Sequence, residues 1–181
     1  RIRERTTDLE KIALTNSLSR KISNNQLTID EAKTELIHLR RASLQYSFFM
    51  NFLAAFIACG FFLFMFGGTA SDFWIACLAG GAAFLTFSFV QKYIQIKFFS
   101  EFVASAVIIS IAAIFTKIGI AKNQDIITIA SVMPLVPGIL ITNAIRDLLA
   151  GELLAGMSRG VEAALTAFAI CAGVAIVLLL L

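Results

Sequence analysis

Residues 133–147 read MPLVPGILITNAIRD and lie inside a long apolar run, yet they contain two prolines, an asparagine, an arginine and an aspartate. Proline has no backbone N–H, so Pro134 and Pro137 each remove a hydrogen-bond donor from any helix that contains them. Gly138 adds backbone freedom directly after the second proline. The sequence therefore predicts a helix that breaks at these prolines and restarts at about Gly138.

The predicted break falls near the middle of an apolar segment that begins at Ile126. The carbonyls of Ala130 and Met133 are expected to lose their helical partners. At membrane depth, such backbone is tolerated only against protein or beside a water-filled cavity. Two interpretations stay open: a proline kink packed against neighbouring helices, or a binding site built on the broken helix.

The composition separates a polar N-terminal segment from a membrane domain. Of the 181 residues, 59% are hydrophobic and 15% are charged, against about 45–50% and about 25% in soluble domains. Residues 1–43 hold 9 of the 15 Lys and Arg, without the interleaved aromatic residues that would suggest a nucleic-acid partner. They contain no apolar core of a signal peptide. Because the chain starts at Arg1 and not at Met, we expect this segment to continue upstream.

The predicted fold class is all-α, a polytopic membrane protein. About 20 apolar residues cross the hydrocarbon core as a helix, and five such runs follow the polar segment. We place these spans near residues 46–66, 73–91, 99–117, 126–147 and 160–181. Capping-box patterns at residues 7–10 and 28–31 predict a short helical hairpin before them. The predicted domains are thus cytoplasmic amphipathic helices over residues 1–43 and a membrane domain over residues 44–181.

The positions of Lys and Arg predict the orientation in the cytoplasmic (inner) membrane of the cell. With the N-terminus in the cytoplasm, thirteen of the fifteen basic residues lie inside, and Lys117 and Lys122 lie outside. Five spans then place the C-terminus outside. An odd number of spans allows a second five-span unit to insert with the opposite orientation, as in transporters built from inverted pairs. We expect such a unit, or further copies of this chain, as a partner beside the membrane lipid.

Polar groups after the break form the predicted site. If a helix restarts at Gly138, its first N–H groups form a positive end suited to a carboxylate. Asn143 and Asp147 are four residues apart and share a helical face, where the amide can bind a carboxylate and the aspartate an ammonium group or a proton. Arg146 projects about 100° away and could pair with Glu152 or with an acidic group on another helix. Alternatively, Arg146 and Asp147 are boundary charges that extend into water.

The predicted substrate and transport residues are Pro134, Pro137, Gly138, Asn143, Arg146 and Asp147. Secondary candidates in the connector that we expect after them, and at the start of the last span, are Gly151, Glu152, Arg159 and Glu162. Gly156 and Gly160 have the GxxxG spacing that permits close helix contact, and Arg159 and Glu162 are placed for a local pair. Glu101 and Asn51 lie near span starts and are interpreted as boundary groups.

The sequence contains no catalytic or metal-binding constellation. Cys59, Cys77 and Cys171 fall in apolar runs, far apart and without metal spacing, and we interpret them as buried apolar residues. His38 is the single histidine and lies outside the predicted spans. No second intramembrane aspartate accompanies Asp147 in a protease-like motif. We therefore predict no enzymatic activity, no metal and no cofactor.

Residues 137–163, PGILITNAIRDLLAGELLAGMSRGVEA, resemble the N-terminal membrane domain of the threonine/serine exporter family. The pattern is Pro-Gly, followed by Asn, Asp, Gly, Gly, Arg and Glu-Ala at these intervals. Residues 5–9, 18–20 and 31–36 are similar to the cytoplasmic helices that precede the first span in this family. The resemblance covers nearly the whole chain, and the family includes two-subunit members linked to succinate export.

The resemblance implies secondary, proton-driven export of threonine, serine or similar small hydrophilic metabolites. It also implies a second membrane domain, either fused or supplied by a partner subunit. Asp147 favours an amino acid over a dicarboxylate, because a dicarboxylate needs two sets of donors and no free carboxylate nearby, unless Asp147 is protonated or paired with a basic group. A dicarboxylate (succinate) exporter subunit and a non-transporting membrane scaffold stay open as alternatives.

Overall fold

The computed structural model describes residues 9–24, 26–27, 29–41, 46–94, 96 and 98–180. Over these ranges the chain consists of helices and the turns between them, without a strand, so the predicted all-α class is confirmed. The chain divides into two compact units, Arg1–Ser47 and Phe48–Leu181. Each unit is described by itself below.

The first unit is a pair of helices, α1 (Leu9–Ser23) and α2 (Ile29–Arg41). Leu18 and Ala32 are buried in it. Lys21 and Glu35 join the two helices by an exposed ion pair with an N–O distance of 3.9 Å, which contributes little to stability. The helices start next to the predicted capping boxes, whose residues 7, 8 and 28 lie outside the described part of the chain.

The second unit contains the apolar helices. They are α3 (Phe48–Met65), α4 (Phe73–Tyr93), α5 (Phe99–Lys117), α6 (Gln124–Val132), the short 3₁₀ helix η1 (Met133–Leu135), α7 (Gly138–Leu149) and α8 (Leu153–Leu180). Among the described residues, four of these, α3, α4, α5 and α8, are long and apolar enough to cross a membrane alone. The bent pair formed by α6–η1 and α7 brings the total to five if it counts as one span. The predicted polytopic membrane architecture is therefore confirmed.

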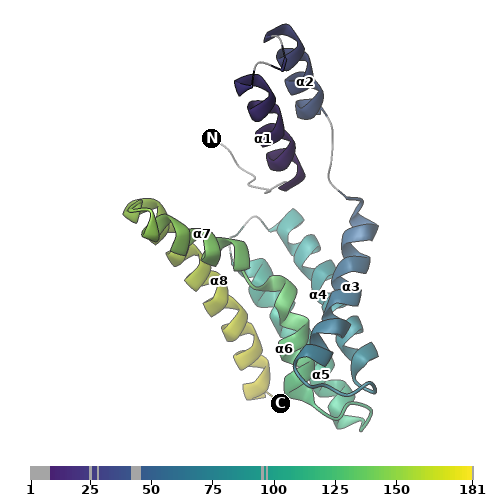
Figure 1. The fold of residues 1–181 in the computed structure, drawn as a ribbon. Helices are drawn as coiled ribbons and strands as arrows, with labels where there is room; N and C mark the ends of the chain where they lie inside the picture. The colour runs from purple at the N-terminus through teal and green to yellow at the C-terminus, as the bar shows by residue number, and fades with distance from the viewer. Residues whose placement is uncertain are drawn as a thin grey trace. The chain divides into compact units, whose positions relative to one another are not determined.

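Helix α4 packs between α3 and α5, and α6 rests on all three of them (Figure 1). Helix α8 packs along α5, while α7 folds back against α8. Beneath α6, a cluster of buried apolar side chains joins the helices; it comprises Leu63, Ile75, Ala76, Ala112, Ala121, Ile127 and Ala130. The first half of the broken segment is thus built into the helix bundle, and the second half belongs to a hairpin with α8.

Small residues set the closest helix crossings, as is usual in membranes. A Cβ atom built on Gly80 of α4 would lie 2.1 Å from the sulfur of Cys59 on α3, and one built on Gly60 would lie 2.6 Å from the sulfur of Cys77. Both of these cysteines are buried, as predicted, whereas Cys171 on α8 is exposed, which corrects the prediction for that residue. Glycine is therefore required where α3 and α4 cross.

The last helix differs from its predicted extent. Helix α8 begins at Leu153, whereas the sequence suggested a start near residue 160. The chain reverses over Ala150–Glu152, where Gly151 has a left-handed backbone with φ of +84°. Gly156 and Gly160 do not interrupt the helix, because they face the neighbouring α7. Arg159 consequently lies inside α8 and not in a connector.

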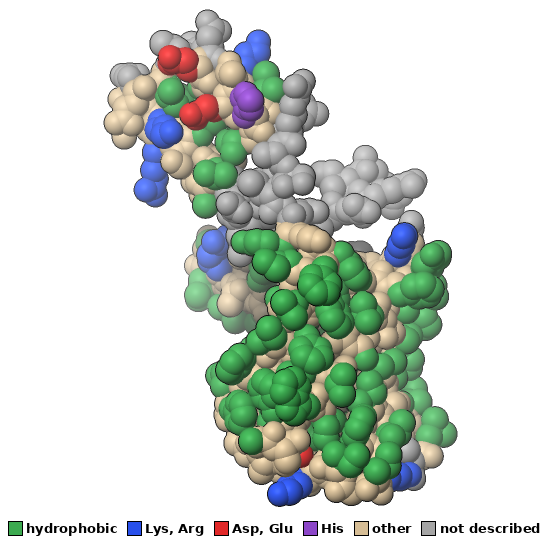
Figure 2. Space-filling model, turned by 90° about the vertical axis from the view of Figure 1, so that its right-hand side faces the viewer, with side chains coloured by type: hydrophobic (Ala, Val, Ile, Leu, Met, Phe, Trp, Pro, Cys, Tyr) green, Lys and Arg blue, Asp and Glu red, His purple; other side chains and the backbone are tan. Residues whose placement is uncertain are grey.

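Large apolar side chains cover the outside of this unit. Figure 2 shows a face that is mostly hydrophobic, with basic side chains toward its two ends. Phe49, Phe61, Leu154 and Phe168 are among the most exposed of these residues, at 61–88%. Soluble monomers rarely expose apolar patches of this extent. The surface is that of a protein whose surroundings are lipid or another apolar protein surface.

Candidate functional site

The predicted break is present in the structure. Helix α6 ends at Val132, η1 carries Pro134 in its first turn, and Val136 is extended with φ of −64° and ψ of 130°. Helix α7 restarts at Gly138, and the two halves meet at an angle of 62°. An uninterrupted helix is thus ruled out for this segment, and the bend is far larger than the gentle curvature of an ordinary long helix.

One of the two carbonyls expected to lose its partner is satisfied locally. The N–H of Val136 donates to the carbonyl of Met133 at an N–O distance of 3.2 Å. The Met133 carbonyl has lost its helical donor, as predicted, but it is not left free, because η1 supplies a tighter i to i+3 bond in its place. The break therefore exposes less unpaired backbone on its α6 side than the proline positions alone suggested.

The last turn of α6 is held by polar contacts that the sequence analysis missed. Ser131 is 1% exposed, and its hydroxyl donates to the carbonyl of Ala76 on α4 at 3.2 Å. The thiol of Cys59 on α3 donates to the carbonyl of Ser131, with a sulfur–oxygen distance of 3.7 Å. A serine in an apolar helix can donate to its own preceding turn or to another helix. The local sequence does not show which of the two acceptors it uses.

On the other side of the break, the start of α7 is open. The N–H of Gly138 donates to Val136, and that of Ile141 to Pro137, at 2.8 and 3.1 Å. For Ile139 and Leu140 the described residues supply no acceptor, and no side chain caps the helix. A Cβ atom on Gly138 would meet nothing within 4 Å. Two free N–H groups at a helix N-terminus attract an anion.

The predicted polar face of α7 turns partly toward α8. Ala144 is buried, and Asn143 and Asp147, on either side of it, are partly buried. The carboxylate of Asp147 accepts a hydrogen bond from the guanidinium of Arg159 on α8, and the two form an ion pair. The Asp147 side chain is 15% exposed and that of Arg159 is 43% exposed. The structure thus joins a primary and a secondary candidate, residues 147 and 159.

Of the two environments predicted for Arg146, an acidic partner or an exposed position, the structure has the exposed one. Among the described residues, Arg146 forms no ion pair with Glu152 or another acid. The backbone turn at Gly151 carries Glu152, itself exposed, away from the α7–α8 contact. Arg159 takes the acidic partner instead. Glu162, partly buried on α8, accepts a hydrogen bond at its carbonyl from Thr166.

The first glycine of the GxxxG spacing lies at a tight contact between α7 and α8. A Cβ atom on Gly156 would lie 2.7 Å from the Leu148 side chain and 3.0 Å from the carbonyl of Ala144. One on Gly160 would lie 4.0 Å from the Cβ atom of Ala144. The prediction that this spacing permits a close helix contact is confirmed, and the contact sets Asp147 and Arg159 within reach of each other.

A second polar centre lies at the opposite end of α6. Asp72, directly before α4, is fully buried. Its carboxylate accepts hydrogen bonds from the hydroxyl of Thr69 at 2.9 Å, the backbone N–H of Lys122 at 3.0 Å and the amide of Asn123 at 3.5 Å. The only sequence signal was a charged residue at the edge of an apolar run, which ordinarily indicates a boundary position. Asp72 therefore ties the α3–α4 connection to the residues that start α6.

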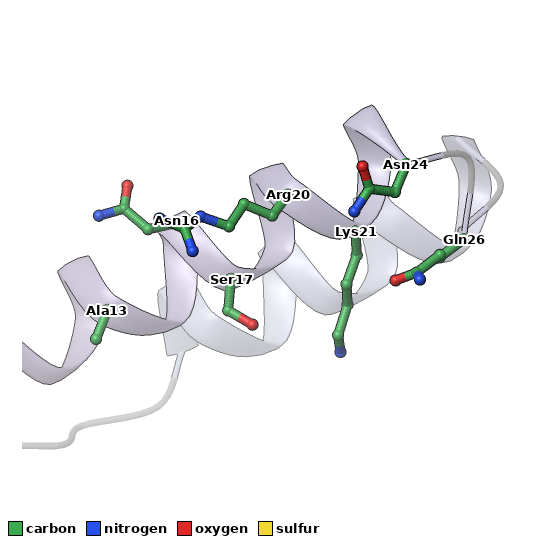
Figure 3. A pocket seen from close by; sticks show the side chains of 7 residues that line it. All are labelled: Ala13, Asn16, Ser17, Arg20, Lys21, Asn24 and Gln26. Atoms are coloured by element: carbon green, nitrogen blue, oxygen red, sulfur yellow. The ribbon is translucent and has the colours of Figure 1, made fainter.

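Other polar groups lie away from the break. Glu101, interpreted as a boundary group, has one carboxylate oxygen that is buried without a hydrogen-bond partner in the described structure. Within that same part of the chain, no three His, Cys, Asp or Glu side chains are grouped to hold a metal ion. In the first unit, an open hollow of about 370 Å³ is lined by polar side chains of α1 and the following turn, including Asn16, Arg20 and Asn24 (Figure 3). That hollow contains no residue of the predicted site.

Comparison with known proteins agrees with the resemblance seen in the sequence. A family model described as "Putative threonine/serine exporter" (ThrE) matches residues 1–181. No curated protein and no solved structure matches the chain. The match covers the entire chain, including the broken segment and the helices of the first unit. The chain therefore belongs to the threonine/serine exporter family, a family of membrane transport proteins.

Proposed function

We propose that this chain is one half, or one subunit, of a secondary transporter that exports threonine, serine or similar small hydrophilic metabolites. The solute would bind at the break between α6 and α7. The observation that carries the proposal is the start of α7, where the N–H groups of Ile139 and Leu140 lack acceptors beside the open space at Gly138. Half-helix N-termini that point at anionic groups are a recurrent element of transporter sites.

The open helix end suits the carboxylate of an amino acid. The two free N–H groups and the positive end of α7 would bind the carboxylate oxygens. Asn143 begins the second turn of α7 and is partly buried. Its amide can both donate and accept hydrogen bonds, so it would contact the hydroxyl or ammonium group of a small hydroxy amino acid.

The Asp147–Arg159 ion pair would provide the coupling to protons. A carboxylate that is paired with an arginine in one state loses that partner when it takes up a proton. We propose that protonation of Asp147, or the approach of a substrate ammonium group, releases Arg159 and loosens α7 from α8. The two charges are joined across the helices and only partly exposed, so changing their pairing would change how α7 packs.

The same ion pair favours a second candidate function, export of a dicarboxylate such as succinate. Pairing with Arg159 removes the free negative charge that argued against a dianionic solute. Arg146 is exposed on the same helix and would supply a second positive group. The substrates of the two candidates differ in charge, since the amino acid carries an ammonium group and the dicarboxylate a second carboxylate, so direct competition between labelled solutes separates them.

A partner would complete the proposed site. Pro134, Val136 and Gly138 are exposed in this chain, yet irregular backbone at membrane depth must be covered by protein or line a wet cavity. We therefore propose that a second five-span membrane subunit, or another copy of this chain, lies over the break. The proposed orientation in the cytoplasmic membrane, N-terminus inside and C-terminus outside, follows from the basic residues.

The proposal predicts efflux of labelled threonine or serine from preloaded cells that contain this chain together with a five-span partner subunit. Efflux is expected to exceed that of cells without the chain and to collapse when a protonophore removes the proton gradient. Labelled succinate serves as the competing substrate. Export of succinate alone would replace the first candidate by the second, and efflux of none of the three solutes would favour the non-transporting scaffold.

Changing Asp147 to Asn should abolish proton-coupled efflux while leaving membrane insertion intact. The substitution leaves the Arg159 guanidinium without its carboxylate partner. Breaking a partly buried ion pair by removing one partner destabilises a protein more than breaking a surface pair. We expect efflux from loaded vesicles to fall at least about tenfold, equivalent to about 1.4 kcal/mol. Glu152→Gln is the matched control, since that carboxylate is exposed on the same hairpin. Parental rates in the Asp147→Asn variant would exclude the coupling role.

A further inference from the structure

Ser131 differs from other hydroxyl residues in the membrane unit. The side chains of Thr86, Ser105, Ser110, Thr116, Thr128, Thr142 and Thr166 donate to carbonyls three or four residues earlier in their own helices. Ser131 instead donates to Ala76, which belongs to a different helix. A buried hydroxyl that leaves its own helix for another fixes the distance and rotation between the two.

The backbone of Ser131 is held as well. Its carbonyl accepts the thiol hydrogen of Cys59, so a single residue links α6 to both α3 and α4. Ser131 is 1% exposed and Cys59 fully buried, and the Cys59 sulfur lies against the glycine crossing at Gly80. Leaving either group unpaired in this buried position would be unfavourable. The last helical turn before the prolines is therefore hydrogen-bonded to two neighbouring helices, α3 and α4.

On the α7 side of the break, the described residues show no comparable hydrogen bonds to α3 or α4. Helix α7 packs chiefly against α8, its N-terminus is uncapped, and Gly138 faces open space. The two halves of the broken segment are thus unequally held. A transporter needs one part of its site to stay in place while another moves around it.

We propose that Ser131 is a positioning residue that fixes the α6 half of the break, so that the α7 side alone moves during transport. The inference rests on the proposed function for its link to the solute. Without the Ser131 hydroxyl, the end of α6 is free to move, and a smaller fraction of the molecules has a site that can bind the solute. Since the apparent affinity falls by that fraction, KM rises while saturating substrate restores the maximal rate.

The expected change follows from the strength of hydrogen bonds between membrane helices. Ser131→Ala should raise KM for threonine efflux between about threefold and about twentyfold, with the maximal rate within about twofold of the parent. Ser105→Ala is the matched control, because Ser105 is equally buried but donates within its own helix. A purely structural role would instead lower the amount of protein and the maximal rate, with KM unchanged.

A second measurement is independent of transport. The background is Cys171→Ser, which removes the exposed native thiol. In it, Thr128→Cys at a buried position of α6 is the reporter for a membrane-impermeant maleimide. The reporter should stay unlabelled in the parent and with Ser105→Ala, and become labelled at least about threefold faster with Ser131→Ala. Gly138→Cys, at an exposed position, should be labelled in the parent and in both the Ser105→Ala and the Ser131→Ala variants.

The two measurements separate the possible failures. If the parent protein exports no threonine, the proposed function fails, and the labelling at residue 128 still decides whether Ser131 holds α6. If Ser131→Ala labels no faster than Ser105→Ala and leaves KM unchanged, the positioning role is overturned even in an active transporter.

Discussion

An alanine at Gly173 is expected to detach α8 from α5 and to leave little folded protein in the membrane. The added Cβ atom would lie 2.1 Å from the hydroxyl of Ser105 and 2.3 Å from the backbone carbonyl of Phe102. A backbone carbonyl cannot turn away as a flexible side chain can, so the two helices must separate. We expect a loss of about 3 kcal/mol, at the upper end of the range for overpacking.

Two other glycines of the same helix provide the controls. Gly160→Ala would bring its new atom only to 4.0 Å from Ala144, so it should be neutral or slightly stabilising, because alanine favours a helix over glycine. Gly156→Ala, at 2.7 Å from a Leu148 side-chain atom, should fall between the two. Thermal unfolding of the purified variants in detergent gives the order. Equal midpoints for Gly173→Ala and Gly160→Ala would contradict the close crossing of α5 and α8.

Replacing Asp72 by alanine should have the second large effect. The carboxylate accepts hydrogen bonds from Thr69, from the backbone of Lys122 and from Asn123 in a fully buried position. Its removal leaves three donors of part-buried hydrogen bonds without their acceptor, each at a penalty toward the lower end of about 1–3 kcal/mol. Asp72→Asn keeps one acceptor oxygen and should be intermediate. The connection that leads into α6 is expected to come loose first.

Hydrogen exchange can localise this effect. The N–H of Lys122 donates to the Asp72 carboxylate, so its exchange should accelerate strongly in Asp72→Ala, together with a lower unfolding temperature. Asp125→Ala is the control, because that carboxylate is exposed in the first turn of α6 and contributes less than about 1 kcal/mol through the helix dipole. Unchanged protection at Lys122 in Asp72→Ala would show that the carboxylate does not hold this connection.

These predictions describe a membrane unit in which α6 is anchored at both ends. Asp72 holds the residues that start it, and Ser131 holds its last turn. The α7–α8 hairpin is joined to itself by the Asp147–Arg159 pair and by the glycine contact at Gly156. Movement at the break would therefore be carried by α7 once that pair is released, while α8 stays packed on α5.

The spans and the break could be read directly from the sequence. Runs of about 20 apolar residues are long enough to cross a membrane whatever their neighbours are, and the runs at residues 73–91 and 99–117 correspond closely to α4 and α5. Proline lacks an N–H in every context, so Pro134 and Pro137 predicted an interrupted helix that the structure contains. The start of α8 was less predictable, since glycines at residues 156 and 160 suit a loop and a tight helix contact equally well.

The pairing of polar groups depended on the tertiary structure. Asp147 was predicted to bind an ammonium group or a proton, or to pair with a basic group that the sequence could not identify. Its partner is Arg159, because the turn at Gly151 folds α8 back along α7. Ser131 and Asp72 reach groups 50 or more residues away in the chain. By itself, the sequence determined where helices form and where one must break, because those properties belong to single residues and local backbone. Which side chains meet was decided by helix crossings and by the 62° bend, because such contacts exist only after distant segments have packed together.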